Sequence, residues 1–77
     1  MKSKQTLSRR QHELMTFIGT YIREHGYPPL QREMAEHMDC AIGTVGGWLF
    51  ILEDRGWLTR QRGWVRAWNV PQKDEAA

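Results

Sequence analysis

Apolar residues recur at helical spacing in the first third of the chain. They follow Ser8 and Gln11, an S-x-x-Q pair typical of a capping box, in which each side chain satisfies a free backbone N–H. The apolar positions that share one face are Leu14, Phe17, Ile18, Tyr21 and Ile22. Gly26 is a natural helix stop, and the prolines that begin at Pro28 cannot continue a helix. The pattern therefore predicts a helix over residues 9–25.

The same spacing predicts two further helices. The inner face of a short helix over residues 31–38 is marked by Met34, Ala35 and Met38. A tight turn at residues 39–41 leads into a third helix over residues 42–55, which Gly56 ends. On a helical wheel, the side of the third helix expected to face the core contains Val45, Trp48, Leu49 and Leu52.

The pattern changes after Gly56. WLTR and WVRAWNV, on either side of a QRG turn, have the composition of two strands of a hairpin. Three helices and a hairpin in this order predict a mainly α fold with a small β-hairpin, a winged helix-turn-helix of three helices plus a wing. We assign residues 8–70 to this domain, residues 1–7 to a basic N-terminal arm and residues 71–77 to a flexible tail.

Charge is distributed unevenly, although the net charge is only +2. Residues 1–10 and residues 55–70 each have a charge of +4 and contain no acidic residue. Residues 11–54, between them, have a charge of −5. Basic ends around an acidic middle indicate a polyanionic partner for the ends, although lopsided charge is also common in small soluble domains.

Other chemistry is not indicated. The single cysteine, Cys40, cannot form an internal disulfide and is typical of a small buried apolar residue. With His12, His25 and His37 it does not make a metal-ligand spacing. The sequence has no Gly-rich phosphate loop, no signal peptide and no apolar stretch long enough to span a membrane. We therefore expect a soluble, cytoplasmic protein that is not an enzyme and has no metal and no cofactor.

Several motifs together resemble the DNA-binding domain of LexA-type repressors. They are RQ-x-E near the start of the first helix, the G-x-PP turn, E-x-A in the second helix, and L-x-x-L-x-x-x-G at the end of the third. The resemblance covers residues 7–70 and implies a winged helix-turn-helix that binds double-stranded DNA. LexA proteins also have a self-cleaving domain with a Ser-Lys dyad, which dimerises them. These 77 residues end before any such domain, so cleavage and that mode of dimerisation are not implied.

The base-reading positions depart from the family's pattern. The family usually has Ser or Thr before helix two and near the start of helix three, where this chain has Leu30 and Ala41, both poor caps. The positions that the resemblance assigns to base reading fall on or near Ala41, Gly43, Thr44, Gly46 and Gly47. Among them, only Thr44 has a side chain that can hydrogen-bond a base. The resemblance therefore predicts the fold but not the DNA sequence that is read.

The outer face of the third helix is predicted to be a glycine notch followed by an aromatic ring. This face contains Gly43, Gly47, Phe50 and Asp54, with Gly46 beside them. Each glycine inside a helix costs about 1 kcal/mol relative to alanine, so the close approach of a partner's backbone would explain them. The partner is either DNA or a helix of another protein, and drift on an unselective surface is a third explanation.

The predicted wing has no acidic residue. Its arginines, Arg60, Arg62 and Arg66, can bind phosphates or enter a narrow minor groove, although an ordinary solvated hairpin could have the same composition. A hairpin must bury one face against the helices, so its aromatic residues are expected to pack rather than to stack on bases. These are Trp57, Trp64 and Trp68.

These observations predict a sequence-selective double-stranded DNA-binding transcriptional regulator, a small repressor. Its DNA-binding residues are predicted to be Gly43, Thr44, Gly46, Gly47, Arg60, Arg62 and Arg66. Because one small module buries little DNA surface, we expect a homodimer or cooperative binding, with Phe50, Trp64 and Trp68 as contacts between chains. The alternative is a winged-helix module that binds a partner or host protein through Gly43, Gly47 and Phe50.

Overall fold

The fold is three helices followed by a short hairpin. A computed structural model describes residues 7–61 and 63–70 of the chain. Its elements are α1 (Arg9–His25), α2 (Gln31–Met38), α3 (Ile42–Asp54), β1 (Thr59–Arg60) and β2 (Trp68–Asn69). This order confirms the predicted winged helix-turn-helix, and each helix begins where the sequence placed it. The predicted tail, and the predicted arm before residue 7, lie outside the described residues.

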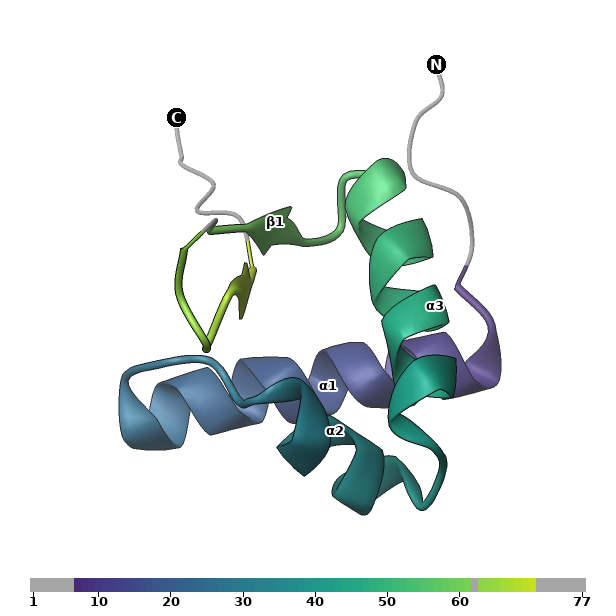
Figure 1. Cartoon of the computed structure of the whole chain (residues 1–77), viewed down its shortest axis with the longest axis horizontal. Helices are drawn as coiled ribbons and strands as arrows, with labels where there is room; N and C mark the ends of the chain where they lie inside the picture. The colour runs from purple at the N-terminus through teal and green to yellow at the C-terminus, as the bar shows by residue number, and fades with distance from the viewer. Residues whose placement is uncertain (1–6, 62, 71–77) are drawn as a thin grey trace.

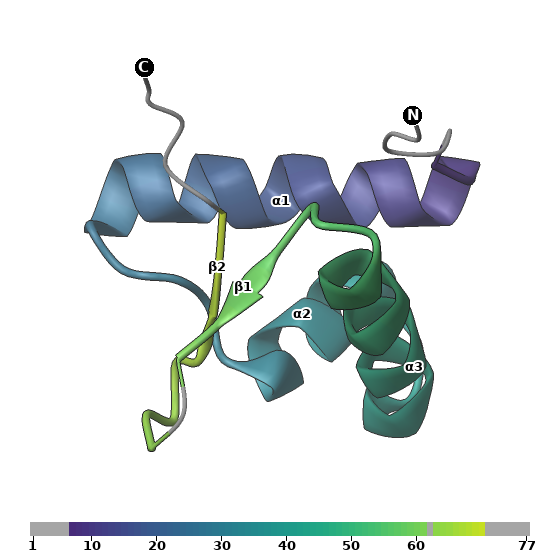
Figure 2. The same cartoon turned by 90° about the horizontal axis from the view of Figure 1, so that it is seen from above.

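The elements are arranged around α1 (Figure 1). α3 lies near the N-terminal half of α1, and the hairpin lies nearer its C-terminal half. Seen from the second direction, the hairpin and α3 both lie on the same side of α1 (Figure 2). Within the described part of the chain, no helix has the length and apolar character needed to cross a membrane.

Both ends of α1 are capped by local hydrogen bonds. The Ser8 hydroxyl oxygen accepts the Gln11 backbone N–H at 3.1 Å, and the Gln11 side-chain oxygen accepts the Ser8 backbone N–H at 3.1 Å. The predicted capping box is therefore confirmed. At the other end, Gly26 has a φ of 82° and donates its N–H to the Ile22 carbonyl at 2.8 Å. Glycine suits this left-handed position because it has no Cβ.

The N-terminal caps of α2 and α3 differ from that of α1. Leu30 and Ala41 offer no side-chain hydrogen bond, as the sequence predicted. α2 compensates through Glu33, whose carboxylate accepts the Leu30 backbone N–H at 2.6 Å. The first turn of α3 has no acidic residue that could do the same. The N-terminus of α3 therefore keeps the partial positive charge of its free N–H groups.

One apolar cluster joins the three helices. Its buried members are Leu14, Ile18, Met34, Ala35, Met38, Val45, Leu49, Leu52 and Leu58. The inner face predicted for α2 is confirmed in full, because Met34, Ala35 and Met38 are all buried. Trp48, predicted to face the core from α3, is only partly buried and packs against the cluster. Core burial thus orients α3 and fixes which of its faces is left exposed.

The hairpin is shorter than predicted. β1 and β2 pair antiparallel over two residues each, with Thr59 opposite Asn69. The predicted strands are wrong for residues 57–58, 64–67 and 70, which lie outside β1 and β2. Within residues 64–67, the hydrogen bonds of Arg66 direct its side chain toward the helices. Trp57 and Trp68 pack against the core as expected. The packing prediction is wrong for Trp64, which is 65% exposed.

Replacing a side chain with alanine should affect stability differently on the buried and the exposed face of α3. Leu49→Ala should lower the free energy of unfolding by about 2–5 kcal/mol, because it leaves a cavity where the side chain is fully buried. Phe50→Ala, the control on the next position, removes a ring that is 67% exposed and should change it by less than about 0.5 kcal/mol. Urea unfolding followed by circular dichroism measures both. Equal losses would contradict this orientation of α3.

Candidate nucleic-acid interface

The exposed face of α3 is smooth and uncharged over its first two turns. Gly43, Thr44 and Gly47 are exposed, and Phe50 follows on the same side of the helix. A Cβ added at Gly43 or at Gly47 would meet no atom within 4 Å. The notch predicted from the sequence is therefore open space, and the Thr44 hydroxyl is the hydrogen-bonding side chain of α3 on it.

Gly46 is in a different environment from the other two glycines. A Cβ at this position would lie 2.9 Å from Nε2 of Gln31, the first residue of α2. This distance is shorter than ordinary van der Waals contact, so a larger residue would displace the Gln31 amide. The sequence grouped Gly46 with the surface glycines, but its absent side chain makes room for a neighbouring helix.

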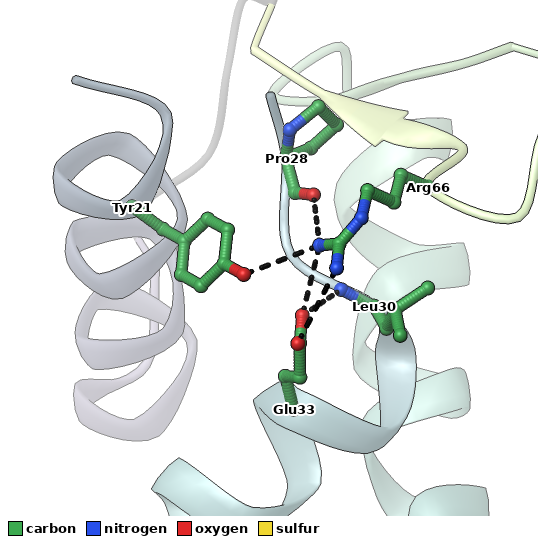
Figure 3. Close-up of polar contacts among 5 residues, drawn as sticks. All are labelled: Tyr21, Pro28, Leu30, Glu33 and Arg66. Carbon is green, nitrogen blue, oxygen red and sulfur yellow. Dashed lines mark hydrogen bonds and ion pairs between the residues drawn. The ribbon is translucent and has the colours of Figure 1, made fainter. Parts of the chain in front are cut away.

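The side chain of Arg66 connects the wing to α1 and α2 (Figure 3). Nη1 donates to the Tyr21 hydroxyl at 3.2 Å and to the Pro28 carbonyl at 2.9 Å. The same nitrogen lies 3.0 Å from Glu33 Oε1, and Nη2 lies 3.4 Å from Oε2, which makes a forked ion pair. The guanidinium also lies over the Tyr27 ring, 4.5 Å from its centroid. We call these contacts the Arg66 network.

Glu33 belongs both to the cap of α2 and to the Arg66 network. The hydrogen bond from the Leu30 N–H lowers the pKa of the Glu33 carboxyl below its ordinary value of 4.5, and Arg66 lowers it further, against an opposing effect of desolvation. In return, the hydrogen bond to Glu33 raises the pKa of Arg66. Both groups are therefore charged at neutral pH, and each stabilises the ionised form of the other.

Arg66 was predicted to contact phosphate, and the structure gives its guanidinium internal partners that the sequence analysis missed. A signal for them was present in α2. Glu33 stands at the third helical position after Leu30, which has no hydroxyl for a reciprocal cap. The carboxylate thus had capacity to accept from a cation as well as from the backbone. Which cation it pairs with depends on a contact across 33 positions, which local patterns do not indicate.

The other wing arginines are placed differently. Arg60 is exposed, and its guanidinium lies 5.2 Å from the centroid of the Trp68 ring. Arg62 lies outside the described residues, so its predicted role stays a prediction. Gly63, next to it, has a φ of 88°, which fits the predicted glycine turn. Arg60 is thus an exposed wing cation that lies over an aromatic ring, whereas Arg66 pairs with a carboxylate of α2.

Arg10, in the basic N-terminal segment, also makes contacts within the folded domain. Arg10 donates to the Met38 carbonyl at the C-terminal end of α2. It also forms an ion pair with Glu13, with 3.0 Å between the charged atoms, and lies over the Trp48 ring at 5.7 Å from the centroid. A cation at a helix C-terminus is favourable because it meets the unpaired carbonyls there. The segment's charge is therefore not all available to a partner.

The residues predicted as contacts between chains are not equivalent. Phe50 on α3 and Trp64 in the wing are 67% and 65% exposed. Trp68 instead packs partly buried against the core. Phe50 and Trp64 thus remain accessible for a partner, whereas Trp68 already has an internal role.

Two of the three histidines, His25 and His37, serve as packing groups. The His37 ring stacks on Phe17 with 4.1 Å between centroids, and the His25 ring stacks on Tyr21 at 4.0 Å. Across residues 7–61 and 63–70, no group of three or more His, Cys, Asp or Glu side chains could hold a metal ion.

Comparison with known families adds a match over most of the chain. The model of the LexA DNA binding domain matches residues 4–67. The LexA repressor of Caldicellulosiruptor saccharolyticus is 36% identical over 72 residues, 92% of this chain and 36% of the repressor. The LexA repressor of Halalkalibacterium halodurans is 42% identical over 65 residues, 83% of this chain and 31% of that protein. The chain thus spans about a third of the length of the curated relatives it matches.

The Arg66 network predicts a pH dependence of stability. Because the folded-state pKa of Glu33 is lowered, its contribution is fully present above pH 4.5 and is lost as pH falls through the lowered pKa. Glu33→Gln should therefore melt below the wild type at neutral pH, and the gap between their melting temperatures should narrow in acid. Glu13→Gln, in an exposed ion pair, is the control for losing one carboxylate. A gap that stays constant from pH 7 to acid would contradict this role of Glu33.

Proposed function

The chain belongs to the LexA DNA-binding domain family, and we propose that it is a sequence-selective transcriptional repressor that binds double-stranded DNA. The observation that supports this most directly is the family match over residues 4–67. The arrangement of α3 and the wing on one side of α1 fits the same function (Figure 2). In such folds the third helix enters the major groove, and the wing lies along the backbone or the minor groove.

The proposed DNA contacts are of three kinds: hydrogen bonds to bases, close approach of the helix backbone, and ion pairs with phosphates. Thr44 can hydrogen-bond a base edge, and Gly43 and Gly47 let the backbone of α3 approach the groove closely. Arg60 and Arg62 would neutralise phosphates. Two residues of the predicted site act through other residues in this proposal. They are Gly46, which makes room for Gln31, and Arg66, which positions the wing.

We also propose that binding involves more than one copy of the module. A single module of this size contacts few base pairs, so a dimer or repeated half-sites would raise affinity and selectivity. Phe50 and Trp64 are among the exposed large apolar side chains, and they could join copies. The role is non-catalytic, in keeping with a DNA-binding domain. A cytoplasmic location is part of the same proposal, since a bacterial repressor acts where the chromosome lies.

Arg60 predicts a salt effect that a purely apolar interface would not show. Arg60→Ala should weaken binding to every duplex and reduce the slope of log affinity against log salt by about 0.9, because one phosphate contact is lost. Arg23→Ala is the matched control, since it removes an exposed arginine from the last turn of α1. Fluorescence anisotropy at several salt concentrations measures both. An unchanged slope for Arg60→Ala would remove this residue from the interface.

A substitution at Gly47 distinguishes the proposal of DNA binding from the alternative, in which α3 binds a helix of another protein. Gly47→Glu places a carboxylate in open space on the exposed face and replaces glycine with a better helix former, so folding should not suffer. Near phosphates the new charge should weaken duplex binding by about tenfold or more, since like charges in contact cost several kcal/mol. Thermal melting, fluorescence anisotropy with duplex DNA and a pull-down from a cell lysate test this together. A folded variant with full DNA affinity that loses a protein partner would overturn the repressor proposal.

A further inference from the structure

The carboxamide of Gln31, the first residue of α2, lies against α3 at Gly46. Its Nε2 donates to the Ile42 carbonyl, in the first turn of α3, at 3.1 Å. The same nitrogen lies 2.9 Å from where a Cβ of Gly46 would stand. Gly43 and Gly47, beside Gly46, are exposed and border open space. A polar side chain from the neighbouring helix thus lies against α3 at Gly46, beside the open space at Gly43 and Gly47.

The bond to Ile42 fixes which way the carboxamide points. A carbonyl oxygen only accepts, so the atom facing it must be the nitrogen of the amide. One N–H of the Gln31 amide is used in this bond, which leaves its second N–H and its Oε1. Among the described residues, no hydrogen bond to this Oε1 is formed. The side chain therefore presents one donor and one acceptor in a fixed orientation.

We infer that Gln31 is a specificity-determining residue that reads an adenine in the major groove. This inference rests on the proposed function, because it requires the face of α3 to lie against DNA. A carboxamide can pair with adenine by accepting a hydrogen bond from N6 and donating one to N7. Gln31 has one acceptor, Oε1, and one N–H left for these two bonds. The hydrogen bond to Ile42 holds the amide in place before DNA arrives, so less side-chain freedom is lost on binding.

The same inference explains why position 46 is glycine. Alanine there would favour the helix, but its Cβ would push the Gln31 amide away from the Ile42 carbonyl. Gly46→Ala should therefore fold at least as well as the wild type and lose sequence discrimination. Gly19→Ala is the matched control, because Gly19 lies inside α1 and a Cβ there meets no atom within 4 Å. It should raise the melting temperature by about 4–8 °C and leave DNA reading intact.

The experiment begins with selection of duplexes from a randomised library by the wild-type protein. Affinities are then measured for the selected duplex and for duplexes in which each base pair is replaced in turn. The wild type and Gly19→Ala should discriminate at every preferred position. Gln31→Ala and Gly46→Ala should lose a factor on the order of ten to a hundred at the same one A·T pair of each half-site. Their binding to unrelated duplexes, and its salt slope, should equal that of the wild type.

The outcomes separate the inference from the proposed function. If Gln31→Ala and Gly46→Ala keep the wild-type preference at every A·T pair, Gln31 does not read adenine, and the repressor proposal still stands. A loss confined to a G·C pair would overturn the adenine assignment. If the wild-type protein shows no salt-dependent binding to any duplex, the proposed function fails, and the role of Gln31 fails with it. Thermal melting of each variant confirms that it is folded before these results are compared.

Discussion

The position of the wing depends on the guanidinium of Arg66. The ladder between β1 and β2 pairs only two residues in each strand, and an isolated hairpin of that size is not stable in water. Arg66 adds hydrogen bonds to α1 through Tyr21, to the following turn through Pro28 and to α2 through Glu33. Four segments are thereby joined at one planar group, and the place of the exposed Arg60 relative to α3 follows from that junction.

This junction also changes how the charge of the wing should be counted. The sequence has four arginines and no acidic residue over 55–70. In the folded protein, Glu33 from another element neutralises Arg66, whose guanidinium also donates to Tyr21 and Pro28. Charge counted along a segment therefore overstates what that segment offers to a polyanion, because ion pairs form across the fold. The same holds at the N-terminal end, where Arg10 pairs with Glu13 and meets the end of α2.

Periodicity and caps predicted most of the fold, because helices and their inner faces are set by residues three or four positions apart. The start of every helix, the Ser8–Gln11 capping box and the buried side of α2 were found in this way. The extent of the hairpin, the exposure of Trp64 and the partners of Arg66 were not. These features depend on contacts between residues far apart in the chain, such as that between Arg66 and Glu33, and local patterns do not indicate which residues will meet.

The glycines of α3 show the same limit at the candidate site. On a helical wheel Gly43, Gly46 and Gly47 lie close together. Among these three, only at Gly46 would an added Cβ meet an atom within 4 Å, and that atom belongs to the Gln31 amide of α2. A surface that lacks polar side chains along one helix can therefore still present them, if a glycine makes room for a side chain from the next. It follows that positions 31 and 46 are coupled: a residue with a Cβ at 46 removes the reason for a carboxamide at 31. The double variant Gln31→Ala/Gly46→Ala should then discriminate no worse than either single variant, because both changes remove the same contact.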